Sequence, residues 1–182
     1  MYTHTVALYP NPITSHDVEL LLCRIQSRDA LKRIQAREVL GKIGKSIVPA
    51  VLKLLWNENE IVRWEACKIL GKIKDARSGN LLAEMLLDEN MDVRWVAAEA
   101  LIALEYDAIE PLLECIEQHF ESTVVRESAH HILKALKDQD IFLPELENVL
   151  DSLKQIVPPI RLAVAANTAL QFVRSRKLQI QQ

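Results

Sequence analysis

Residues 63–73, RWEACKILGKI, align without a gap on residues 33–43, RIQAREVLGKI. Three more copies follow at residues 93–101 (VRWVAAEAL), at residues 125–133 (VRESAHHIL) and, in shortened form, at residues 160–166 (IRLAVAA). The arginine that marks each copy recurs after 30, 31, 32 and 35 residues. Self-similarity at a period of ~20–50 residues is the signature of a repeat protein, in which each unit stacks on the next.

Each copy has the periodicity of an α-helix. At ~100° per residue, Val62, Ala66, Ile69, Leu70 and Ile73 fall on one face, which must be buried against neighbouring helices. A second apolar helix is expected before each copy, at residues 16–26, 47–56, 78–87, 108–119 and 142–154. The prediction is an all-α fold, a right-handed α–α superhelix or solenoid of about five helix pairs.

The repeat register divides the chain into three parts. Residues 1–14 are expected to form an extended N-terminal arm, residues 15–176 a single repeat domain, and residues 177–182 a polar C-terminal tail. Of the 182 residues, 49% are hydrophobic and 26% are charged, which is typical of a globular protein and not of a disordered one.

The sequence also predicts a cellular setting. No apolar run is long enough for a membrane helix, and the start lacks a basic segment followed by an apolar one. The three cysteines, Cys23, Cys67 and Cys115, are scattered through apolar helical patterns, so we expect reduced core thiols. Together these features predict a cytoplasmic protein that does not contact a membrane.

The pattern Val-Arg-x-x-Ala-Ala-x-Ala-Leu after a polar turn resembles the short HEAT-like repeats, a class that also occurs in phycobilin lyases. The resemblance implies that the second helix of each pair lines the concave surface. It also implies a ladder between repeats, in which each repeat arginine pairs with an acidic residue of the preceding turn. The expected ladder arginines are Arg33, Arg63, Arg94, Arg126 and Arg161. The expected acidic partner is Asp92, with Asp29 and Glu60 as displaced candidates.

The position after each repeat arginine suggests a binding surface. On a helical wheel that starts at Val62, this position lies at ~200°, almost opposite the buried face. In successive repeats this position is occupied by Ile34, Trp64, Trp95, Glu127 and Leu162. Four of the five are large and apolar where a solvated helix should be polar, so they are candidate anchors for a partner segment.

Further residues complete this predicted partner-binding face. Ile102 continues the apolar line on its helix, and Arg33, Lys68 and Glu99 are expected around the two indoles. Two other interpretations stay open: both indoles fill the groove between helices and extend the core, or the N-terminal arm covers them. Trp56 ends a first-helix run and is expected to be structural.

Catalytic and metal-binding patterns are missing. The di-iron deoxyhypusine hydroxylases, which resemble this chain in repeat pattern, take their ligands from His-Glu dipeptides, and this sequence has none. His130 and His131 are adjacent on a helix and point ~100° apart, so they cannot chelate one ion together. The cysteines have no paired-ligand spacing, and no Gly-rich phosphate loop is present. We therefore expect no catalytic residue, metal, cofactor or small-molecule substrate.

The charge distribution argues against a nucleic-acid partner. The formal net charge is -3, whereas HEAT-like DNA glycosylases use a basic concave surface. Locally, residues 24–53 carry a net charge of +6, residues 80–121 of -10 and residues 158–182 of +4. These blocks either steer a partner or are an uneven distribution over solvated helix faces.

The sequence thus favours a non-enzymatic scaffold that binds a peptide or helix of another protein on its concave face. The alternative is a phycobilin lyase-like or chromophore-handling subunit that binds a linear tetrapyrrole. A weaker alternative is nucleic-acid binding through the basic first repeat.

Overall fold

The computed structural model describes residues 13–154 and 158–180, and within them every regular element is helical. The first helices of the five pairs are α1 (Ser15–Ile25), α3 (Val48–Leu52), α5 (Gly79–Glu84), α7 (Ile109–Gln118) and α9 (Glu147–Lys154). The second helices are α2 (Ala30–Ile43), α4 (Glu60–Ile73), α6 (Met91–Ala103), α8 (Thr123–Asp138) and α10 (Pro159–Ile180). Short 3₁₀ turns lengthen several first helices: η1 (Gly44–Ile47), η2 (Lys53–Trp56), η3 (Ala76–Ser78), η4 (Met85–Leu87), η5 (Glu105–Ala108) and η6 (Pro144–Leu146).

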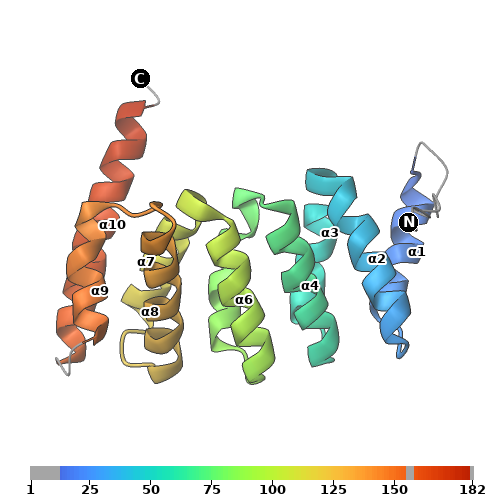
Figure 1. The fold of residues 1–182 in the computed structure, drawn as a ribbon, viewed down its shortest axis with the longest axis horizontal. Helices are drawn as coiled ribbons and strands as arrows, with labels where there is room; N and C mark the ends of the chain where they lie inside the picture. The colour runs from blue at the N-terminus through green and yellow to red at the C-terminus, as the bar shows by residue number, and fades with distance from the viewer. Residues whose placement is uncertain (1–12, 155–157, 181–182) are drawn as a thin grey trace, which may run out of the picture.

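The helix pairs stack in chain order and confirm the predicted solenoid. The second helices α2, α4, α6 and α8 pack on one another in sequence and form one layer, while α5 and α7 pack together in the layer of first helices. Figure 1 shows the pairs side by side across the molecule, with α1 and α10 at opposite ends of the stack. Because neighbouring repeats supply the contacts, the core is continuous along the stack rather than central.

Side-chain caps and left-handed residues set where each second helix starts and stops. Four residues before each of the first four repeat arginines, a side-chain oxygen accepts a hydrogen bond from a backbone N–H of the first turn, as an N-cap does. These N-caps are Asp29, Asn59, Asn90 and Ser122. After each of these helices the chain turns through a residue with positive φ: Gly44, Lys74, Glu105 and Asp140.

The stripe predicted from helical periodicity is the core. Val62, Ala66, Ile69 and Leu70 are buried, and Ile73 is nearly so. The cysteines divide differently from the prediction: Cys67 and Cys115 are buried, whereas Cys23 is exposed. Burial raises the pKa of each buried thiol to about 12, which keeps both protonated at neutral pH.

The last pair departs from the order of the others. α9 packs against α8, in the layer of second helices, while α10 packs against α7 and α9. Ion pairs fix this exchange, because Arg174 contacts Glu110 and Glu114 of α7, and Lys177 Nζ lies 2.5 Å from Glu110 Oε2. The basic C-terminal segment therefore neutralises part of the acidic middle third within the fold.

The chain ends also differ in part from the predicted domain limits. α10 continues to Ile180, so the start of the segment predicted as a C-terminal tail is helical. α1 begins at Ser15 and is capped by Thr14, whereas residues 1–12 of the predicted arm lie outside the described residues.

Candidate functional site

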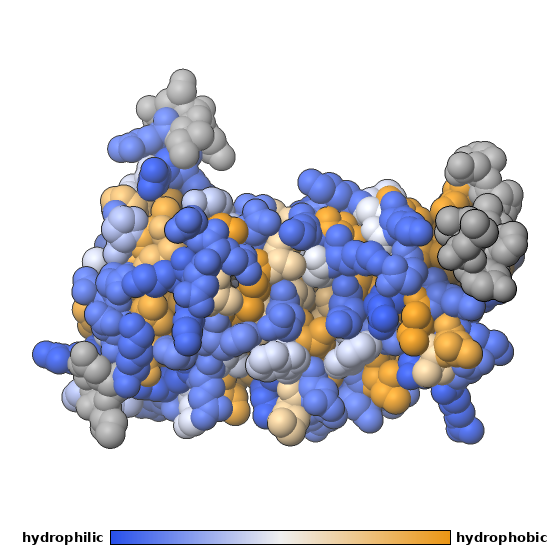
Figure 2. Space-filling model, viewed as in Figure 1, coloured by the Kyte–Doolittle hydropathy of each residue, from blue (hydrophilic) through white to orange (hydrophobic). Residues whose placement is uncertain are grey.

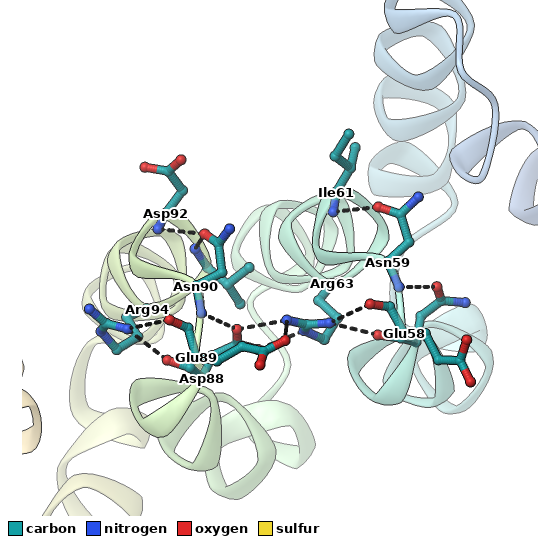
Figure 3. A network of polar contacts seen from close by, with 11 residues as sticks. Glu58, Asn59, Ile61, Arg63, Asp88, Glu89, Asn90, Asp92 and Arg94 are labelled. Atoms are coloured by element: carbon teal, nitrogen blue, oxygen red, sulfur yellow. Dashed lines mark hydrogen bonds and ion pairs between the residues drawn. The ribbon is translucent and has the colours of Figure 1, made fainter.

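Arg63 joins two repeats through a buried ion pair. Its Nε and Nη2 donate to the two carboxylate oxygens of Asp88, at 2.7 and 2.9 Å, and both side chains are less than one-tenth exposed. Its Nη1 donates to the backbone carbonyls of Asn57 and Glu58 in the turn of its own repeat. Figure 3 shows this guanidinium between the two turns, bonded to both. Arg63 thereby fixes the spacing between the second and third repeats.

The equivalent arginines of the neighbouring repeats make related contacts. Arg94 donates to the carbonyls of Asp88 and Glu89, and Arg33 donates to those of Ser27 and Arg28. Arg33 also reaches the next repeat, where Glu65 accepts from it and from Arg37, at 3.3 and 2.7 Å. The ladder is therefore present over the first three repeats.

The acidic partners of the ladder were predicted wrongly. They are Asp88 and Glu65, both of the following repeat, and not Asp92, Asp29 or Glu60. Asp29 is instead the N-cap of α2. Within the described part of the chain, Arg94, Arg126 and Arg161 form no ion pair, so the ladder of ion pairs ends at the third repeat.

Burial and hydrogen bonding act on Asp88 in opposite directions. Burial by itself would raise the pKa of this carboxyl group, but the hydrogen bonds from Arg63 and from the Asn90 amide outweigh it. The resulting pKa lies below the ordinary value of 3.8, so the carboxylate is ionised at neutral pH. The pair is a structural element of the scaffold on which the exposed face is built.

Trp95 is the most prominent aromatic side chain of the second-helix layer. It lies on α6 and is 59% exposed. Its ring stacks on His131 of α8, with centroids 4.7 Å apart and an interplanar angle of 29°. His131 Nε2 in turn lies 2.8 Å from Glu99 Oε1. The indole is thus oriented by a neighbouring repeat while more than half of its surface faces solvent.

Trp64, one repeat earlier, is more enclosed. It lies on α4, is half-buried and packs against the core. Arg37 and Lys68 approach its ring, with the Arg37 Cζ and Lys68 Nζ atoms 5.6 and 5.1 Å from the centroid, within cation–π range. For Trp64, the alternative that the indole extends the core is therefore correct in part, whereas Trp95 remains on the surface.

The first turns of α2, α4 and α6 carry further exposed apolar side chains. On α2 and α4 they are three residues apart, and on α6 four residues apart, so each pair shares one helix face. We call the whole set the second-helix patch: Leu31, Ile34, Ile61, Trp64, Met91 and Trp95. Figure 2 shows apolar side chains in separate clusters among polar ones on this side of the molecule.

Only half of the second-helix patch was predicted. Ile34, Trp64 and Trp95 follow the repeat arginine, whereas Leu31, Ile61 and Met91 were missed. The available signal was an apolar residue one or two positions after the N-cap of three successive second helices.

Two predicted patch residues are in the core instead. Ile102 is only 8% exposed, because α6 lies between α4 and α8 and buries apolar side chains on both flanks. Leu162 is fully buried, because α10 packs on α7 rather than continuing the layer of second helices. The exposed apolar row is therefore confined to α2, α4 and α6.

The charged residues predicted around the indoles have separate roles. Lys68 is exposed above the Trp64 ring, and Glu99 binds His131 beside Trp95. Arg33 is mostly buried in its ion pair with Glu65 and offers little to a partner. A cleft of about 290 Å³ opens within the patch and is lined by Arg33, Glu60, Ile61, Trp64, Glu65, Asn90 and Asp92.

No group of three or more His, Cys, Asp or Glu side chains in residues 13–154 and 158–180 is arranged to hold a metal ion. Over these ranges, no helix has both the length and the apolar character that a bilayer crossing requires.

The stacked helix pairs define an α-solenoid repeat protein. Comparison with known families agrees: a model described as HEAT repeats matches residues 18–102, and one described as PBS lyase HEAT-like repeat matches residues 93–118. The two matches together span more than half of the chain, which belongs to the HEAT-repeat family. No curated protein matches it.

Proposed function

We propose that this protein is a scaffold that binds an apolar peptide or helix of another protein over the second-helix patch. The observation that carries the proposal is the exposure of Leu31, Ile34, Ile61, Met91 and Trp95 on three adjacent helices. Exposed aromatic and large aliphatic side chains on neighbouring helices are typical anchors for a segment of a partner protein. HEAT-repeat membership supports the same class of function.

The second-helix patch is held rigidly, which favours binding. Its side chains project from helices that the buried Arg63–Asp88 pair and the core hold in fixed positions. A rigid surface loses little conformational entropy when a partner docks, so more of the contact energy appears as affinity. Trp95 is the expected energetic centre, because aromatic side chains that a partner desolvates dominate most interfaces.

The test is a quantitative pull-down from an extract of the organism that makes the protein. Wild type is compared with Trp95→Ala and with Trp56→Ala, a matched control that removes an equally exposed indole from another surface, since Trp56 is 62% exposed. We expect at least one protein to be retained by wild type and Trp56→Ala and lost with Trp95→Ala. If Trp95→Ala retains every protein that wild type retains, the proposal is wrong.

A second candidate is a chromophore-handling role, favoured by the match of residues 93–118 to a PBS lyase HEAT-like repeat. Such a protein would bind a linear tetrapyrrole, whose conjugated rings could stack on an exposed indole such as Trp95. Adding bilin to the purified protein should then shift and sharpen its visible absorption band. A spectrum equal to the sum of the separate components would exclude this role.

A further inference from the structure

A second open groove lies outside the second-helix patch, at the edge where first helices turn into second helices. It has a volume of about 620 Å³, and its lining includes Trp56, Leu87, Glu84, Glu89 and His119. We call it the turn-edge groove. No part of the second-helix patch lines it, so it needs an explanation of its own.

The apolar part of the turn-edge groove is repeated along the stack. Trp56 ends η2 and Leu87 ends η4, and their separation of 31 residues equals one repeat. Trp56 is 62% exposed and Leu87 is also exposed, so the expectation that Trp56 is structural was wrong. In each short helix the core position is taken by a neighbour, Leu55 or Leu86, and the last side chain therefore points outward.

The polar part of the groove is acidic. Glu84, Asp88 and Glu89 face a single cation among the lining residues, Arg63. That guanidinium is already used, because it binds Asp88 through two nitrogens and two turn carbonyls through a third. Glu89 Oε1 lies 3.5 Å from Arg63 Nη2, but the Glu89 side chain is almost fully exposed. Glu84, which also lines the groove, has no ion-pair partner in the described part of the chain. The groove therefore keeps an excess of negative charge.

This charge selects the kind of occupant. Phosphate groups of nucleic acids and of anionic lipids would be repelled by the carboxylates, whereas lysine and arginine side chains would be attracted. The exposed indole and leucine side chain require an apolar contact beside those cations, and a tryptophan ring also favours an arginine or lysine above its face. A segment with both an apolar side chain and neighbouring cations can contact the apolar and the acidic parts of the groove together.

We propose that the turn-edge groove is a second docking surface, which binds a protein segment in which an apolar side chain is flanked by lysine or arginine. The apolar side chain packs against Trp56 and Leu87, and the flanking cations pair with Glu84 and Glu89. This surface is independent of the second-helix patch, so the protein can hold two segments at once and join them.

Selection from a library of short random peptides tests the proposal. The library is selected on wild type, on Trp56→Ala, on the charge-reversed double variant Glu84→Lys/Glu89→Lys, and on Trp95→Ala as the control at the other surface. We expect wild type and Trp95→Ala to enrich peptides that combine a basic residue with a large apolar one. The enrichment should disappear with Trp56→Ala, and the charge-reversed variant should select acidic residues in place of basic ones.

An enriched peptide then gives the affinity. Its Kd should rise at least tenfold for Trp56→Ala, remain within twofold for Trp95→Ala, and rise with added salt. Circular dichroism melts show whether each variant is folded, and the charge-reversed variant, which removes no core atom, keeps the test valid if Trp56→Ala is unstable. Enriched peptides without basic residues, no enrichment at all, or equal binding by Trp56→Ala would each overturn the proposal.

These outcomes are separable from those for the second-helix patch. If every enriched peptide is lost only with Trp95→Ala and still binds Trp56→Ala, the result supports the patch and overturns the groove proposal. Peptides lost only with Trp56→Ala would support the groove even if the patch has no partner.

Discussion

Replacing Gly71 by alanine should loosen the contact on which the position of the two indoles depends. Gly71 lies on α4, and a Cβ atom there would be 2.9 Å from Ala100 Cα and 3.0 Å from Ala100 Cβ on α6. The obstructing atoms include backbone, which cannot rotate away. The two helices must therefore separate, and with them the turns that carry Trp64 and Trp95.

Two opposing terms set the size of the effect. Alanine is a better helix former than glycine, which stabilises the folded protein by about 1 kcal/mol. Overpacking against a backbone atom costs about 1–3 kcal/mol. The net expectation is a loss of about 1 kcal/mol, with about 2 kcal/mol as the upper end. For a chain of this size this corresponds to a decrease in Tm of about 2–8 °C.

Gly41 provides a matched control at the same position of the preceding repeat. A Cβ atom there would lie 2.6 Å from Lys72 Cδ, which belongs to a flexible side chain. Moving Lys72 disturbs an ion pair with Glu38 in which both side chains are more than one-third exposed, and such pairs contribute at most about 1 kcal/mol. Gly41→Ala should therefore be neutral or stabilise the protein slightly.

The assay is urea unfolding of both variants and wild type, with circular dichroism as the signal. We expect Gly71→Ala to unfold at lower urea than wild type and Gly41→Ala to unfold at equal or higher urea. If the two substitutions change the unfolding free energy equally, or if Gly71→Ala stabilises the protein, the close approach of α4 and α6 is not as described.

Three further predictions concern buried charges and thiols. Arg63→Ala should reduce the unfolding free energy by about 3–5 kcal/mol, because it leaves Asp88 buried without its partner; a loss below about 1 kcal/mol in urea unfolding would contradict this. Because the pKa of Asp88 is lowered on folding, its contribution is present above pH 3.8 and is lost as the pH falls through the folded-state pKa; the difference in Tm between wild type and Asp88→Asn should shrink over that range, and a constant difference would refute the assignment. Iodoacetamide should alkylate only Cys23 in the native protein, as mass spectrometry can show, because burial raises the pKa of the Cys67 and Cys115 thiols to about 12; labelling of all three at one rate would be inconsistent with the fold.

The repeat architecture was predictable because its signals are local. The copies around Arg33, Arg63 and Arg94 carry the spacing, and helical periodicity identifies the buried face that contains Leu70. The first inference compares short segments of the chain with one another, and the second compares residues along one helix, where geometry follows directly from sequence.

What the sequence did not reveal depends on packing between distant segments. Ile102 lies opposite a buried stripe on a helical wheel, but α6 has neighbours on both sides and no face there is free. Leu162 follows a repeat arginine, yet α10 packs in the layer of first helices. Asp88 lies 25 residues after Arg63, so the sequence gives no local sign of their ion pair.

The candidate site was predicted in part for a related reason. The rule that an apolar residue after the repeat arginine is exposed holds on α2, α4 and α6, where Ile34, Trp64 and Trp95 retain exposed or half-buried surface. Trp56 was expected to be structural because it ends the apolar run of a first helix, and that pattern does not anticipate the 3₁₀ turn η2 at the end of the helix.

The most direct test of the proposed function compares affinity and stability in one variant, Trp95→Ala. For a partner identified by the pull-down, affinity should fall at least about 30-fold, because an aromatic anchor desolvated at an interface contributes about 2 kcal/mol or more. The unfolding free energy should fall by only about 1 kcal/mol, because the indole is already 59% exposed in the free protein. Unchanged affinity together with a loss of stability of about 3 kcal/mol or more, the cost of removing a core tryptophan, would show that Trp95 serves the fold and not a partner.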